Sequence, residues 1–151
     1  FMMNGAVTLG TMDGANIEIF EEVGPDNMFV FGLDPSEVIR LYSSHSYRSS
    51  DLYGSDARIR AAVDHLSDGF LPAARHEFDR IRAHLLDEND EFLTLKDLPG
   101  LCAALADIGA AYLDEDRWTR MSLVNIARSG RFSSDLTIRK YADEIWRVRT
   151  T

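Results

Sequence analysis

The spacing of the first two apolar runs constrains the fold of this chain more than any other feature. Ala6 to Leu9 is a short run between two glycines, and Met28 to Phe31 is a continuous apolar run of strand length. Between them, Ala15 to Val23 has a helical composition and is closed by Gly24-Pro25. A strand, a helix and a strand at this spacing predict a βαβ unit with two parallel, neighbouring strands and a right-handed crossover.

The rest of the chain is predicted to be mainly helical. Asp34-Pro35-Ser36-Glu37 has the cap, the first-turn proline and the acidic third residue of a helix start, so a helix is expected to about Tyr42. A loop rich in serine and tyrosine is expected from Ser43 to Gly54. Apolar positions at helical spacing predict five more helices. They lie at Ile59, Ala62, Val63 and Leu66; Phe78, Ile81 and Leu85; Leu98, Leu101, Leu105, Ile108 and Tyr112; Trp118, Met121, Val124 and Asn125; and Ile138, Tyr141, Ala142 and Ile145.

The predicted class is therefore α/β, a short parallel βαβ unit followed by a mainly helical layer. Two strands make a poor sheet alone. Asn4-Gly5 follows the apolar run Phe1 to Met3 as the pair that commonly ends a helix, so a helix is expected to finish where the chain starts. Both features lead us to expect that the chain is part of a larger α/β domain.

Composition excludes several classes of function. The formal charge of −9 disfavours nucleic acid as a partner, because binding to phosphate backbones needs clustered Lys and Arg. Cys102 is the only cysteine, so no intrachain disulfide is possible; its apolar neighbours predict a small buried hydrophobe, and a reducing cytoplasm fits best. A membrane partner is not expected, because no run of about 18 apolar residues is present.

The loop from Gly10 to Asn16 lies where a doubly wound fold binds ligands, at the carboxyl end of a strand and the start of a helix. It lacks the G-x-G-x-x-G order. A tight turn in which Asp13 caps the following helix is favoured over direct ligand contact. The loop alone therefore predicts no site.

No metal site is predicted. His45, His65, His76 and His84 have no metal-ligand spacing. The acidic stretch from Asp87 to Glu91 alternates like a calcium loop, but Phe92 stands where glycine is required, so a solvated loop is expected.

Two features near the carboxyl end admit a functional and a structural interpretation. Ser129 to Asp135 could cradle a phosphate, but a joint between helices, capped by Ser133 or Ser134, is favoured. Trp118 and Trp146 are expected to be anchors in a core or an interface rather than platforms that stack on sugars.

Several blocks of this sequence resemble one known family. F-M-x-N-G-A-x-T-x-G-T-M-D-G-A-N-x-E, from Phe1 to Glu18, is similar to the segment of glycogen and starch phosphorylases that directly follows the cofactor lysine. The likeness continues at Glu21 to Gly24 and at Asn27 to Gly32, and it fades from about Asp34 to Asp116. It returns in blocks at Trp118–Met121, Asn125–Ala127, Ser129–Asp135, Thr137–Ile138, Tyr141–Ala142 and Glu144–Trp146.

This resemblance implies a glycosyltransferase-B fold, of which residues 1–151 would be the C-terminal portion of the second, cofactor-binding domain. It implies a cytoplasmic enzyme, a homodimer in its complete form, that releases glucose 1-phosphate from glycogen, starch or maltodextrin with inorganic phosphate. Pyridoxal 5′-phosphate would act there through its phosphate group. The final helix, with its Tyr141 to Trp146 face, would pack towards the first domain.

The resemblance transfers no catalytic residue to this chain. The family's Schiff-base lysine would directly precede Phe1, and neither Lys96 nor Lys140 lies in that context. The isolated chain is therefore expected to be inactive and to bind no cofactor. Residues near that lysine are candidates for the wall of the cofactor pocket: Asn4, Gly5, Thr11 and Asp13.

Two other functions stay open from the sequence. A different glycosyltransferase-B enzyme, such as a glycogen synthase, would bind a nucleotide sugar, and the block from Thr11 to Asn16 speaks against it. An independent helical interaction module would be a monomer with a closed core. A phosphorylase fragment would instead self-associate through its open strand edge or its uncovered helix faces.

Overall fold

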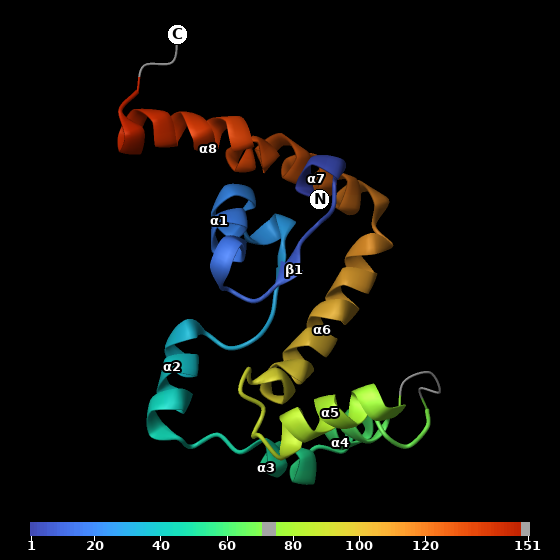
Figure 1. Cartoon of the computed structure of the whole chain (residues 1–151). Coiled ribbons are helices and arrows are strands. Elements are labelled where there is room, and N and C mark those ends of the chain that lie inside the picture. The colour runs from blue at the N-terminus through green and yellow to red at the C-terminus, as the bar shows by residue number, and fades with distance from the viewer. Residues whose placement is uncertain (71–74, 149–151) are drawn as a thin grey trace. The chain divides into compact units, whose positions relative to one another are not determined.

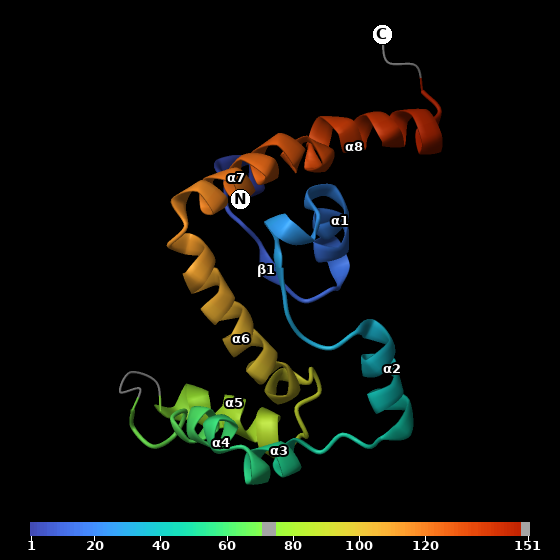
Figure 2. The same ribbon diagram turned by 180° about the vertical axis from the view of Figure 1, so that it is seen from behind.

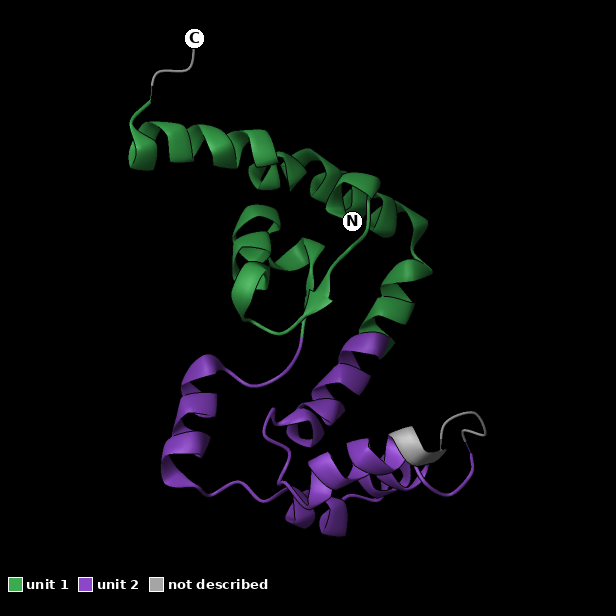
Figure 3. Cartoon of the chain, in the orientation of Figure 1, with its two compact units in different colours: residues 1–30, 106–151 green, residues 31–105 purple. Residues whose placement is uncertain are grey.

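The protein is mostly helical and contains one two-stranded parallel sheet. The structure is a computed structural model that describes residues 1–70 and 75–148, with the side chains of all of these except 75–77. Unit 1 comprises residues 1–30 and 106–151, and unit 2 comprises residues 31–105 (Figure 3). Within the described ranges, no helix combines the length and the apolar character that a membrane span requires.

Unit 1 contains the sheet and the helices of both chain ends. Its elements are η1 (Met2–Asn4), β1 (Leu9–Gly10), α1 (Gly14–Val23), η2 (Pro25–Asn27), β2 (Phe29–Val30), the end of α6 (Thr94–Tyr112), α7 (Glu115–Arg128), η3 (Ser129–Phe132), α8 (Ser134–Lys140) and the π-helical segment η4 (Tyr141–Trp146). In both views of the ribbon, α1 and β1 lie on the same side of the helical stretch formed by α7 and α8 (Figures 1 and 2). Helix α7 contacts η1, α1 and η2.

The predicted parallel pairing is confirmed, with Leu9 opposite Phe29 and Gly10 opposite Val30. Both strands are shorter than predicted. Residues 6–8 have no ladder partner apart from the Thr8 carbonyl, which accepts a hydrogen bond from the Phe29 amide at 2.9 Å. Val30 keeps 38 % of its surface exposed, so within this chain the second apolar run is not covered on both faces.

The predicted helix between the strands is confirmed as α1. It ends at Gly24, whose φ of 76° lies in the left-handed region that glycine adopts without strain, and whose amide donates to the Phe20 carbonyl. Val23, Met28 and Met121 are among the buried apolar residues of unit 1.

Unit 2 consists of α2 (Pro35–Ser44), α3 (Ser49–Ser55), α4 (Ala57–Asp64), α5 (Arg75–Leu86) and the first part of α6. Helices α3, α4 and α5 lie together in both views (Figures 1 and 2). Ile59, Val63 and Leu95 form its buried cluster, and Leu98, the first residue of the stripe predicted for α6, packs against it. The prediction that this whole stripe is an apolar packing face is wrong at Leu105 and Tyr112, which are exposed. The predicted start of α2 is also confirmed, because Asp34 accepts a hydrogen bond from the Ser36 amide.

The loop predicted from Ser43 to Gly54 is wrong over its second half, where α3 forms. Its sequence has a low helix propensity, but tertiary contacts override it. The side chain of Asn89 accepts a hydrogen bond from the Ser49 amide at 2.9 Å, and Leu52 and Tyr53 pack against the buried cluster. These contacts come from residues distant in the sequence, which local patterns do not report.

Two predictions of burial are also wrong. Cys102 is exposed on α6, because the helix turns the buried Ala104 rather than Cys102 inward. Asp90, in the acidic stretch expected to be a solvated loop, has no exposed surface, whereas Asp87, Glu88, Asn89 and Glu91 are exposed as expected. Asp90 is buried because backbone amides and a tyrosine hydroxyl bind its carboxylate.

Candidate functional site

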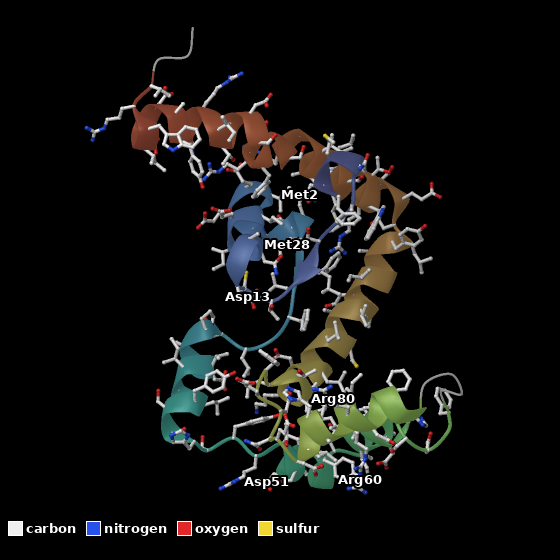
Figure 4. The ribbon with its side chains drawn as sticks, viewed as in Figure 1. Met2, Asp13, Met28, Asp51, Arg60 and Arg80 are labelled. Carbon is white, nitrogen blue, oxygen red and sulfur yellow. The ribbon has the colours of Figure 1, made fainter. Side chains whose placement is uncertain are left out.

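The four residues predicted to line a cofactor pocket form two separate pairs in unit 1. Asn4 and Gly5 lie at the end of η1, which packs against α7. Thr11 and Asp13 lie beyond β1, in the turn that enters α1. Figure 4 shows this separation, with Met2 of η1 near α7 and Asp13 at the opposite end of the extended segment.

Gly5 is held in a position that strongly favours glycine. Its φ is 80°, and its amide donates to the Met2 carbonyl, which closes η1. A Cβ at this position would lie 2.3 Å from the Ser122 hydroxyl oxygen. That hydroxyl donates a hydrogen bond to the Gly5 carbonyl at 2.8 Å, so α7 fixes the end of η1.

One helical turn further along α7, Asn125 fixes the entrance to the second strand. Its side chain is fully buried, and its Nδ2 donates to the Asn27 and Met121 carbonyls, both at 2.9 Å. Residues three apart lie on the same face of a helix. One face of α7 therefore binds both segments, η1 through Ser122 and the end of η2 through Asn125. Among the described residues, Oδ1 of Asn125 has no hydrogen-bond partner although it is buried.

The turn from Gly10 to Asn16 is tight, as predicted, but Asp13 does not cap α1 through its side chain. Asp13 occupies the N-cap position, and its carboxylate accepts a hydrogen bond from the Thr11 hydroxyl at 2.8 Å instead. Asn16 Nδ2 donates to the Thr11 carbonyl at 2.9 Å, and a Cβ on Gly10 would lie 2.5 Å from that nitrogen. Hydrogen bonds between residues of the turn therefore fix its conformation.

Three of the four candidate residues offer no free side-chain donor to the phosphate of pyridoxal phosphate. Asp13 is an acid, and the Thr11 hydroxyl already donates to it. Gly5 offers only an occupied carbonyl on this face. Lys96 lies on α6 in unit 2, and Lys140 is exposed on α8. Asn4 is exposed at the end of η1, and its side-chain amide can donate. Contact of the four residues with the cofactor therefore stays a prediction.

The segment from Ser129 to Asp135 forms the predicted joint between helices. Ser133 occupies the N-cap position of α8, but its side chain makes no capping hydrogen bond. Arg131 Nε lies 3.5 Å from a Glu22 carboxylate oxygen, an ion pair that ties the joint to α1. This arginine is therefore engaged within the fold, which argues against a phosphate cradle.

The histidines gather at no metal site in the part of the chain that the structure describes. His65 Nδ1 lies 2.9 Å from Asp68, and His84 Nδ1 lies 2.7 Å from Glu88. The side chain of His76 lies outside the described residues. Trp118 stacks edge-to-face with Tyr112, and Trp146 with Tyr141. Trp146 keeps 55 % of its surface exposed, so its role as an anchor in an interface stays a prediction.

Sequence reasoning did not assign a role to the residues that fix this region, namely Ser122, Asn125 and Asn16. Asn125 carried a usable signal, because it is a polar residue within an otherwise apolar stripe, and such a residue needs a buried partner. Ser122 carried none, since serine is common on exposed helix faces.

Comparison with known proteins identifies the family of this chain. A model of the carbohydrate phosphorylase family matches residues 1–148. The chain belongs to the carbohydrate phosphorylase family. It is 48 % identical to the glycogen phosphorylase of Bacillus subtilis over 99 % of its own length and 19 % of the relative's. It is 44 % identical to the maltodextrin phosphorylase of Streptococcus pneumoniae over 98 % of the chain and 20 % of that relative. The bovine muscle glycogen phosphorylase is 40 % identical over 100 % of the chain and 18 % of its own length.

The chain thus spans about a fifth of the length of the curated relatives that it matches. The blocks that carried the resemblance lie almost entirely in unit 1, at η1 to α1 and at α7 to η4. The stretch in which the resemblance fades corresponds mainly to unit 2. The family signature therefore coincides with the part of the fold that α7 organises.

Proposed function

We propose that this chain is part of an α-1,4-glucan phosphorylase, which uses inorganic phosphate to release glucose 1-phosphate from glycogen, starch or maltodextrin. The observation that carries the proposal is the family match over residues 1–148, with relatives at 40–48 % identity that are named glycogen and maltodextrin phosphorylases. Their names give no support to the alternative of a glycogen synthase.

Within such an enzyme, the chain would form the C-terminal portion of the second domain of a glycosyltransferase-B fold. The parallel βαβ unit and its covering helices support a place in a larger parallel sheet, because such sheets are normally buried on both faces. The enzyme would use pyridoxal phosphate, which supplies acid–base chemistry through its phosphate when bound. Of the candidate residues in this chain, only Asn4 keeps a side-chain donor, so residues outside 1–151 would make most of the contacts to that phosphate, and the chain alone would be inactive.

The proposal includes self-association of the isolated chain. The α8–η4 stretch leaves large apolar side chains exposed: Ile138, Tyr141, Ile145 and Trp146. The two-stranded sheet also presents unpaired edges. Light scattering of the 151-residue chain across a concentration series should show a mass that rises with concentration, whereas a constant monomer mass would contradict this part of the proposal. A complete enzyme would be a homodimer in the cytoplasm, where the exposed Cys102 thiol stays reduced.

Phosphorolysis is the direct test of the reaction. The native protein that contains this sequence is incubated with maltodextrin and inorganic phosphate, and glucose 1-phosphate is measured by a coupled assay. The expected result is glucose 1-phosphate that depends on phosphate, with no product from the 151-residue chain alone. Free glucose in place of glucose 1-phosphate, or product formed by the isolated chain, would contradict the proposal.

A further inference from the structure

Unit 2 contains a cavity that the proposed function does not use. Its volume is about 460 Å³, within the usual range for ligand sites. The wall is formed by the end of α2, the segment that follows it and the connection from α5 to α6. The polar and aromatic residues among those that line it are Tyr42, His45, Tyr47, Arg48, His84, Glu88, Asn89, Asp90 and Glu91.

Hydrogen bonds between distant segments hold the wall in place. The buried Asp90 carboxylate accepts from the Tyr47 hydroxyl at 2.8 Å and from the Thr94 and Leu95 amides at 3.0 and 2.7 Å. Asn89 Nδ2 donates to the Tyr47 carbonyl at 3.1 Å. The Tyr42 hydroxyl donates to the Glu91 carbonyl. A wall fixed before binding loses little entropy when a ligand enters.

The backbone of this wall is also strained. Asn89, Asp90 and Leu93 have φ values of 61°, 48° and 56°, in the left-handed region that residues other than glycine seldom adopt. Such residues persist only where their surroundings enforce them, and they gather at ligand clamps and active sites. Here the Asp90 hydrogen bonds are the enforcing contacts.

Several polar groups of the wall have no partner within the protein. Among the described residues, no hydrogen bond or ion pair is formed by the Arg48 guanidinium, the His45 ring or the Glu91 carboxylate. The Arg48 guanidinium is a strong donor, the His45 ring can donate or accept, and the Glu91 carboxylate is an acceptor. Tyr42, with 48 % of its surface exposed, adds an aromatic ring beside them.

The charges of the wall select among ligand classes. An anion would face Glu88, Asp90 and Glu91, with Arg48 as the one arginine of the lining. A cation would face Arg48, and it would find the Asp90 and Glu88 carboxylates already engaged, which leaves the single carboxylate of Glu91 to balance its charge. A neutral polyhydroxylated ligand suits both the mixed donors and acceptors and the aromatic ring, because each hydroxyl donates and accepts while the C–H face of a sugar packs on a ring.

We propose that this cavity binds a short, neutral oligosaccharide through Arg48, Glu91 and the ring of Tyr42. The assignment of a sugar rests on the cavity itself. The choice of an α-1,4-linked probe rests on the proposed function. Phosphorolysis and binding at this cavity are measured separately, so failure of either proposal is distinguishable from failure of the other.

Saturation-transfer NMR of the full 151-residue chain with maltopentaose tests the site, because this measurement tolerates self-association of the protein. Saturable transfer is expected. Arg48→Gln should weaken the apparent affinity by about tenfold or more, the effect of losing a hydrogen bond to a charged group. Arg40→Gln is the matched control, since Arg40 lies outside the cavity and pairs only with Glu37, at 3.5 Å.

A second pair of variants guards against an effect on folding. Glu91→Gln should also weaken binding, whereas Glu37→Gln should not, and circular dichroism should show the same helix content in all four variants. Three results would overturn the proposal: no saturable transfer from maltopentaose, an equal loss in Arg40→Gln and Arg48→Gln, or binding of inorganic phosphate at these residues without binding of the sugar.

Discussion

Each unit of the protein fixes its irregular segments with one buried polar side chain, but the two units do so differently. In unit 2, three donors at 2.7–3.0 Å satisfy both oxygens of Asp90. In unit 1, Asn125 satisfies only its amide nitrogen, and its Oδ1 is buried without a partner among the described residues. The Asp90 carboxylate is therefore satisfied at both oxygens and Asn125 is not, although unit 2 also buries one polar atom without a partner among the described residues, the Ser49 hydroxyl oxygen.

Large apolar side chains are exposed in both units, among them Ile39, Phe70 and Phe92 in unit 2. Unit 2 has a buried cluster around Ile59, Val63 and Leu95. Unit 1 has a sheet of two short strands and a terminal helix face that stays exposed at Ile145 and Trp146. The comparison indicates that the two units differ in how their irregular segments are held, through a fully paired carboxylate in unit 2 and a half-paired amide in unit 1.

The largest expected effect is the loss of the Asp90 network. Asp90→Asn replaces one acceptor oxygen with a donor nitrogen opposite a backbone amide or the Tyr47 hydroxyl, which should lower the free energy of unfolding of unit 2 by about 3 kcal/mol. Amide hydrogen exchange of Thr94 and Leu95 measures it. Asp87→Asn is the control, because Asp87 is exposed and should change exchange little. Equal protection in both variants would contradict the role of Asp90.

In unit 1 the largest effect is expected at Gly5. Gly5→Ala meets both the strain of a positive φ and the Ser122 hydroxyl, and should destabilise the packing of η1 on α7 by about 2 kcal/mol. Ser122→Ala alone should cost about 1 kcal/mol for its lost hydrogen bond. The double variant should be less destabilised than the sum, because the steric clash is gone. Denaturation followed by tryptophan fluorescence measures all three, and strict additivity would show that the clash does not occur.

Local patterns in the sequence predicted the parts of the fold that local chemistry determines. The helix start at Asp34, the end of α1 at Gly24 and the parallel pairing of the two strands all follow from residues close in sequence. Helix α3 and the burial of Asp90 did not, because both depend on contacts across about forty residues, such as Tyr47 with Asp90.

The candidate site shows the same limit. The segment from Gly10 to Asn16 predicted the tight turn at Thr11 and Asp13. The hydrogen bond from Ser122 to Gly5, in contrast, joins residues 117 positions apart. No periodicity reports a contact of that kind. The exposed Cys102 differs for another reason, since small apolar neighbours occupy both faces of a helix and do not identify the buried one.

A smaller effect is expected at Tyr47. Burial, followed by the hydrogen bond to Asp90, raises the pKa of the Tyr47 hydroxyl above the ordinary tyrosine value. Tyr47→Phe removes one of the three donors to Asp90 and should cost unit 2 about 1.5 kcal/mol. The exchange of Leu95 should rise less than in Asp90→Asn. If it rises as much, Tyr47 rather than the amides dominates the network.

The smallest expected effect is a loss of stability at the start of α4 at low pH. Hydrogen bonds from the Arg58 side chain and amide hold the pKa of Asp56 below its usual value of 3.8. The stability that Asp56 gives the start of α4 is therefore present above pH 3.8, and it is lost as the pH falls through the pKa of the folded state. Amide exchange near Arg58 and Ile59, corrected for intrinsic rates, should rise only in acid. Asp56→Asn should remove this pH dependence, and its persistence in that variant would assign it to another group.

The claim that this chain is a phosphorylase segment rather than a free-standing helical module is tested most directly by borohydride reduction of the native protein, followed by peptide mass mapping. The account predicts a chain several times longer than 151 residues that carries a pyridoxyl group on a lysine directly before Phe1. A native chain of this length without a pyridoxyl group would contradict the account and favour the interaction module.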